Sequence, residues 1–130
     1  MMRIAGLLSA VSVLAVDPAS ADEIRRTVFA GSLVGNWAQS ADLCAKDDKS
    51  NFAITTSGYK GPDGSCNVDV IVETPGSKGT NYSVRSHCTA TPQDQPRVVG
   101  VIMRQAGPDD LAIGASFEEL KPYQRCPAKP

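Results

Sequence analysis

Residues 66–88 read CNVDVIVETPGSKGTNYSVRSHC. The stretch has a cysteine at each end and two runs, which together contain four valines, one isoleucine and one tyrosine, on either side of a turn. Valine, isoleucine and tyrosine fit the pleated surface of a sheet. Gly76 and Gly79 allow the backbone to reverse between the runs. The stretch therefore predicts an antiparallel hairpin with strands at Cys66–Glu73 and Asn81–Thr89.

The register of this hairpin follows from alternation of apolar and polar residues. Folding the chain about Ser77 pairs residues whose numbers sum to 154. On the inner face this gives three apolar pairs: Cys66 with Cys88, Val70 with Val84, and Val72 with Tyr82. On the outer face Asp69 faces Arg85, a favourable cross-strand pair. Ile71 breaks the alternation, but a slip of one residue would expose both apolar rows.

The rest of the chain repeats this pattern of short strands and turns. Further strands are expected at Leu33–Ala38, Phe52–Tyr59, Arg97–Arg104 and Leu111–Phe117. Inward positions on two of them are Phe52, Ile54 and Thr56, and Leu111, Ile113, Ala115 and Phe117. The only helix candidates, Asp22–Arg26 and Glu118–Lys121, are one turn long. We predict an all-β, antiparallel up-and-down meander that closes into a barrel of six to eight strands and removes the exposed edges.

The four cysteines form the predicted framework of this barrel. Their gaps are long and contain no C-x-x-C, which excludes the usual zinc spacing and favours disulfides. The hairpin register favours Cys66–Cys88, which leaves Cys44–Cys126 to join the two ends of the domain. Sequential pairing, Cys44–Cys66 with Cys88–Cys126, remains the alternative, because spacing does not fix connectivity.

The first 21 residues predict a signal peptide. Arg3 precedes an apolar run, and Ala19-Ser20-Ala21 forms a small-x-small cleavage site, so residues 22–130 remain as one domain after cleavage following Ala21. We expect a periplasmic or secreted monomer, and no later stretch has the roughly 20 apolar residues of a spanning helix. With 13 basic and 14 acidic residues, the chain offers nucleic acid no general attraction.

Gly35-Asn36-Trp37 and the late Arg125 resemble the G-x-W…Arg pattern of calycin-like barrels, which include lipocalins, avidins and small bacterial periplasmic protease inhibitors. The resemblance implies that Trp37 closes one end of the barrel and that Arg125 covers it through a cation–π contact. In that group Gly35, Trp37 and Arg125 are structural residues and do not contact ligand.

Residues with catalytic or metal-binding chemistry are few. His87 is the single histidine, and with Asp69 and Arg85 nearby we read it as a solvated strand residue. The oxygen-rich stretch Asp42–Asn51, with Asp42, Asp47, Asp48 and Ser50, lacks the EF-hand order, and Asp109-Asp110 is likewise read as a solvated turn. No nucleophile elbow or phosphate loop is present. We therefore expect no catalytic residue, no metal, no cofactor and no enzyme activity.

A binding module is the function that fits these features best. A small barrel with apolar side chains inside has little room in its lumen, so contacts fall to its loops and outer surface. Candidate loops are Lys60–Ser65, Thr74–Gly79 and Gln105–Asp110. The expected partner is another exported protein, with inhibition of a hydrolase as one form of that function. The alternatives are a carrier of a small apolar ligand in the barrel and a structural envelope protein.

Overall fold

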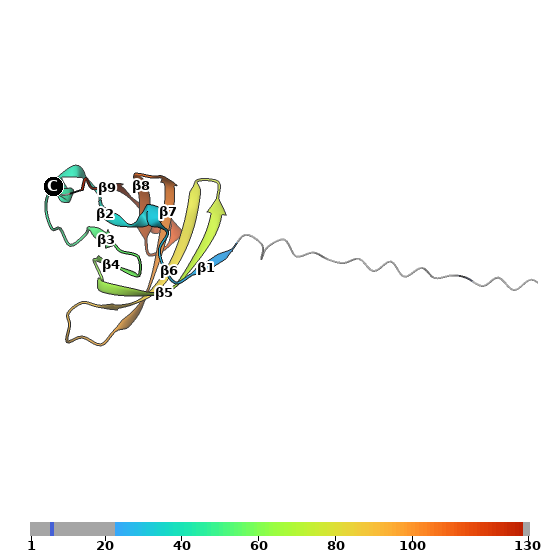
Figure 1. Ribbon diagram of the computed structural model, residues 1–130, viewed down its shortest axis with the longest axis horizontal. Helices are drawn as coiled ribbons and strands as arrows, with labels where there is room; N and C mark the ends of the chain where they lie inside the picture. The colour runs from blue at the N-terminus through green and yellow to red at the C-terminus, as the bar shows by residue number, and fades with distance from the viewer. Residues whose placement is uncertain (1–5, 7–22, 129–130) are drawn as a thin grey trace, which may run out of the picture.

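The computed structural model describes Gly6 and residues 23–128 of the chain, so the predicted signal peptide and its cleavage site lie outside the described residues apart from Gly6. The described elements are strands, of which three have 11 to 13 residues, together with one helical turn and two 3-10 turns (Figure 1). In chain order they are β1 (Ile24–Arg26), η2 (Gly31–Leu33), β2 (Gly35–Ala38), α1 (Ala41–Cys44), β3 (Phe52–Ile54), β4 (Gly58–Gly61), β5 (Gly64–Gly76), β6 (Gly79–Thr89), β7 (Arg97–Gly107), β8 (Asp110–Gly114), η3 (Phe117–Glu119) and β9 (Lys121–Arg125).

The sheet is a closed antiparallel meander. From β2 to β9 each strand pairs with the next, and β9 pairs back with β2, which makes a barrel of eight strands. β1 lies outside this cycle and pairs with β5 at Glu73, Val72 and Ile71, beyond the point where β4 ends. The predicted all-β, up-and-down barrel is confirmed. Within Asp22–Arg26, expected as a helical turn, Ile24–Arg26 instead form β1, and Asp22 lies outside the described residues.

The β5–β6 hairpin follows the predicted register only near its cysteines. Cys66 faces Cys88, but a β-bulge between Val68 and Val70 shifts the remaining pairs by one residue. As a result, three predicted pairs are wrong. Val70 faces Arg85 in place of Val84, Val72 faces Ser83 in place of Tyr82, and Arg85 no longer faces Asp69. The extra residue of a bulge reverses which side chains point inward, so Ile71 becomes the buried residue of this half.

Two other strand boundaries differ from prediction. The run 52–59 is two strands, because Thr55 and Gly58 close a turn through a backbone hydrogen bond of 2.9 Å. β8 ends at Gly114, where an added Cβ would lie 2.4 Å from the Glu119 carbonyl oxygen of the η3 turn. Ala115 and Phe117 are therefore exposed and not inward, and Thr56 is exposed as well. The strand β9, with Pro122 in it, was not predicted.

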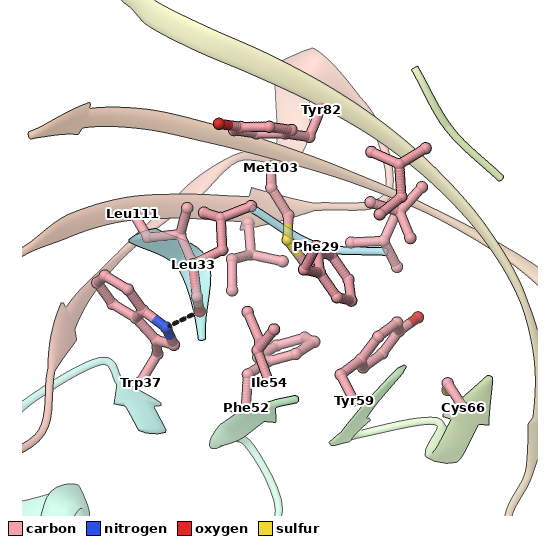
Figure 2. Packing of buried hydrophobic residues seen from close by; sticks show 14 of the residues in the cluster. Phe29, Leu33, Trp37, Phe52, Ile54, Tyr59, Cys66, Tyr82, Met103 and Leu111 are labelled. Carbon is pink, nitrogen blue, oxygen red and sulfur yellow. Dashed lines mark hydrogen bonds between the residues drawn. The ribbon is translucent and has the colours of Figure 1, made fainter. Parts of the chain in front are cut away.

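The inward side chains fill the barrel (Figure 2). Trp37, Leu33 and Met103 are fully buried, and the rings of Phe52 and Tyr123 meet edge to face at 5.4 Å between centroids. The remaining buried apolar residues are Phe29, Ala38, Ile54, Tyr59, Cys66, Ile71, Tyr82, Val84, Cys88, Val101, Leu111 and Ile113. Burial of this set supplies the main driving force for folding.

Two disulfides join distant parts of the chain. Cys66 bonds to Cys88 across the β5–β6 hairpin, and Cys44 bonds to Cys126 over a separation of 82 residues. This is the pairing that the hairpin register favoured, and the sequential alternative is wrong. The second bridge joins α1 to the end of β9, so the C-terminal end of the described chain lies beside α1 (Figure 1).

All three tyrosines of the chain titrate above the usual range of a phenol, because burial raises the pKa of Tyr59, Tyr82 and Tyr123. Folding thus favours the neutral phenols, and the stability they contribute is present below pH of about 10 and is lost as the pH rises through the folded-state values. We expect the tyrosinate absorbance at 295 nm to rise at higher pH in the native protein than in urea. Coincident curves would contradict this packing.

Candidate functional site

One end of the barrel is closed by Trp37 and Arg125. The Trp37 ring is fully buried, and its Nε1 donates a hydrogen bond of 2.9 Å to the Leu33 carbonyl (Figure 2). The guanidinium carbon of Arg125 lies 4.3 Å from the centre of the Trp37 ring, within cation–π range. The same guanidinium donates to the carbonyls of Ser32 (2.6 Å), Val34 (2.8 Å) and Pro108 (3.0 Å). This guanidinium therefore ties η2 to the β7–β8 turn above Trp37.

Gly35 fits this closed end for a steric reason. Its φ is +142°, which side-chain-bearing residues rarely adopt, and an added Cβ would lie 2.6 Å from Nη1 of Arg125. Arg125 thus lies against both Gly35 and Trp37, the other two residues that carry the resemblance. Their geometry is structural and leaves no room for a ligand between ring and guanidinium.

An outer groove of about 680 Å³ crosses the outside of β2, β3 and β4. Its floor includes a row of outward residues that the strand pairing places side by side: Asn36 faces Ala53, and Ala53 faces Lys60. Gly61, Pro62 and Gly64 of the β4–β5 turn and Ala90 after β6 continue the lining. Of the three loops predicted to bind, Lys60–Ser65 is the one that contributes to this groove.

The rim of the outer groove is the segment after α1, which includes Lys46, Asp47, Asp48 and Lys49. Asn51 holds this segment in place, since its Nδ2 donates to the carbonyls of Leu43 (2.8 Å) and Lys46 (3.0 Å). The Asp48 carboxylate accepts bonds from the hydroxyl and amide of Ser50, and these bonds lower the pKa of Asp48. The acidic stretch is thus organised by its own hydrogen bonds.

A second hollow, of about 460 Å³, lies at the barrel end opposite Trp37, and we call it the mouth cavity. Its apolar lining comes from inward side chains at this end of the barrel: Phe52, Val101, Ile113 and Tyr123. Asp63, Glu119 and Lys121 stand around it. The β6–β7 connection, residues 90–96, projects away from the barrel at the lower left of Figure 1.

His87 lies on the outer face of β6, where the bulge brings it to Asp69. Its Nδ1 contacts the Asp69 carboxylate, and both side chains are about half exposed. The predicted pair of Asp69 with Arg85 is therefore replaced by a contact of Asp69 with His87. This exposed pair lies outside the linings of both the outer groove and the mouth cavity.

The exposure of this pair predicts a small effect on stability. Replacing His87 with alanine is expected to change the free energy of unfolding by less than about 1 kcal/mol, since even a charged pair contributes little at an exposed site. Urea unfolding at neutral pH measures the difference, and a loss of several kcal/mol would show that His87 carries a structural role beyond its contact with Asp69. Asp69→Asn is the matched control, because it removes the carboxylate that His87 contacts.

The described part of the chain contains no group of three or more histidine, cysteine or acidic side chains arranged to hold a metal ion. Its helices are single turns, and none among the described residues is long and apolar enough to cross a bilayer. Cys44, Asn36 and Ala53, which line the outer groove, were not predicted as binding residues. Their positions follow from strand pairing and from the long-range disulfide, neither of which leaves a local motif.

Comparisons with protein-family models, with curated proteins and with solved structures found no match to this chain. The fold and the geometry of the two hollows are therefore the basis for any assignment of function.

Proposed function

We propose that the protein is a small exported binding module that docks another exported protein in the outer groove. The observation that carries this proposal is the groove itself, about 680 Å³ across three strands of the outer wall. Inhibition of an exported hydrolase is the form of this function that the resemblance to small calycin-like inhibitors suggests. Membership of that group rests on Gly35, Trp37 and Arg125 and is part of the proposal.

The rigid rim supports docking of a protein partner. The Cys44–Cys126 disulfide fixes one side of the groove, and the two hydrogen bonds from Asn51 fix the loop that follows α1. A preorganised surface loses little conformational entropy on association, so more of the contact energy appears as affinity. The lysines and aspartates of the rim match the polar rim of protein interfaces, and Ala53, between Asn36 and Lys60, gives the floor an apolar centre.

The filled barrel centre favours this function over carriage of a ligand in the lumen. Trp37, Leu33, Met103 and their neighbours occupy the interior, and the mouth cavity lies at one end. Two disulfides and the absence of a spanning helix among the described residues are consistent with life outside the cytoplasm, where disulfides persist. Export itself rests on the predicted signal peptide.

The test fills the groove without touching the core. Ala53→Trp places a large ring on the groove floor, and Arg85→Trp places the same ring on the exposed outer face of β6 as a matched control. The oxidised proteins are used to capture partners from envelope and culture-fluid extracts of the source organism. We expect one stoichiometric partner, lost at least about tenfold with Ala53→Trp and kept with Arg85→Trp.

Thermal unfolding of both variants shows whether each is folded. Equal capture by the two variants would contradict docking in the groove. Recovery of only lipid or pigment, with no protein, would favour the carrier function in its place.

A further inference from the structure

One strand of the barrel is unpaired along part of its length. β7 pairs with β6 from Arg97 to Gln105, but it pairs with β8 only from Ile102 onward. Among the described residues, no strand covers the other side of residues 97–101. Alternate residues of this stretch therefore direct a backbone N–H and C=O to the open side, where a further strand can pair.

The gap has a clear structural cause. Gly114 is the last residue of β8, and it faces Ile102. Beyond it the chain turns back through η3, and the Glu119 carbonyl occupies the space next to Gly114 that a side chain would need. After Gly114 the chain no longer pairs with β7, so residues 97–101, which precede Ile102, have no partner strand on this side.

The mouth cavity lies along this open edge. Gly100 and Val101 of β7 line it together with Gly114 and Ala115, at the point where the two segments separate. At about 460 Å³ it falls in the range of roughly 300–1,000 Å³ that ligand pockets occupy. The edge is open on the outer face too, since nothing lies within 4 Å of a Cβ built on Gly100 and Val98 is 60% exposed.

We propose that residues 97–101 of β7 are a strand-addition site for an extended segment of a partner protein that carries one aromatic or large aliphatic side chain. The backbone of that segment pairs with the β7 edge. Because side chains alternate along a strand, every second one points inward, and one of these fills the mouth cavity among Val101, Ile113 and Tyr123.

The surrounding charges define the remaining chemistry of the partner segment. Arg97 pairs with Asp63 at 3.1 Å, and Glu119 and Lys121 beside the cavity carry opposite charges. The cavity walls at Phe52 and Tyr123 are apolar. The segment therefore has an uncharged centre.

The mouth cavity shares Phe52 and Pro62 with the outer groove, but Val101 lines only the cavity and Ala53 lines only the groove. The variants at these two positions therefore test the two proposals independently, and failure of one leaves the other standing.

The probe is an acetylated and amidated peptide, TVFVT, added to the oxidised, ¹⁵N-labelled protein. We expect the peptide to shift the protein's amide resonances chiefly at residues 97–101. We also expect TVFVT to bind at least about tenfold more tightly than TVAVT, because the phenylalanine ring is buried in the cavity. Two further peptides test the backbone pairing: the first is N-methylated on Phe and the second on both Val residues. Because only alternate amides of the peptide donate hydrogen bonds to β7, we expect N-methylation to abolish binding of one of these peptides and not of the other.

Two protein variants separate the cavity from the edge. Val101→Phe fills the cavity and is expected to abolish the preference for TVFVT over TVAVT, whereas Val98→Phe, on the outer face, keeps it. Equal affinity of the two peptides for the unaltered protein, or shifts confined to the outer groove, would overturn the proposal. So would shifts at residues 97–101 that appear with protein concentration alone, because a second copy would then occupy the edge.

Discussion

Replacing Trp37 with alanine is expected to lower the free energy of unfolding by about 3–5 kcal/mol, the range for removing a large buried aromatic side chain. Trp37 is fully buried, and its Nε1 is the donor to the Leu33 carbonyl. Its loss leaves a cavity under Arg125, whose guanidinium lies 4.3 Å from the ring. Urea unfolding followed by circular dichroism measures the change.

Two control variants separate the parts of this effect. Trp37→Phe keeps an aromatic ring and loses the hydrogen bond, so a smaller loss of about 1–3 kcal/mol is expected from the unpaired Leu33 carbonyl. Arg125→Lys keeps the charge but removes the planar guanidinium that binds three carbonyls. A Trp37→Ala protein within about 1 kcal/mol of the unaltered one would contradict the closed end described above.

Removing the Cys44–Cys126 bridge is the second large effect. The chain-entropy relation for a loop of 82 residues gives a loss of about 4.5 kcal/mol in the free energy of unfolding. The double variant Cys44→Ala/Cys126→Ala avoids a free thiol, and urea unfolding of the oxidised protein measures the loss. A change below about 1 kcal/mol would show that this bridge does not restrict the unfolded chain.

The same variant has a local consequence at the outer groove. α1 is held to the end of β9 by this bridge, so amides of the 41–51 segment are expected to exchange hydrogen faster through local opening, whereas those of β5 and β6 lose only the protection that corresponds to the fall in global stability. The matched comparison is Cys66→Ala/Cys88→Ala, which removes a bridge of 22 residues within the β5–β6 hairpin and leaves the rim attached.

The barrel was predictable from sequence because its signals are local. The alternation of apolar and polar residues, the turn residues and the two hairpin cysteines are each recognisable within a short stretch of sequence. Cys66 faces Cys88 as predicted because the bulge comes after Cys66 along β5. Ile71, which breaks the alternation, was itself the sign of that bulge. The contacts beyond it were wrong because a single extra residue reverses the facing of all later ones.

The outer groove and the open β7 edge were not predictable in the same way. Pairing of three strands is what brings Asn36, Ala53 and Lys60 together. The rim is held beside them by a disulfide whose cysteines are 82 residues apart in the sequence. The edge exists because η3 turns the chain away at Gly114, a tertiary contact with the Glu119 carbonyl. Neither the groove nor the open edge leaves a local pattern of residues in the sequence, because both depend on contacts between distant segments.

Photo-crosslinking from the groove tests the docking proposal most directly. Benzoylphenylalanine is placed at Lys60, on the groove floor, and separately at Ser83, on the exposed outer face of β6, and each oxidised protein is irradiated in extracts of the source organism. We predict a light-dependent adduct of a single mass from position 60 and none from position 83. Adducts of equal yield from both positions, or from neither, would contradict docking in the outer groove.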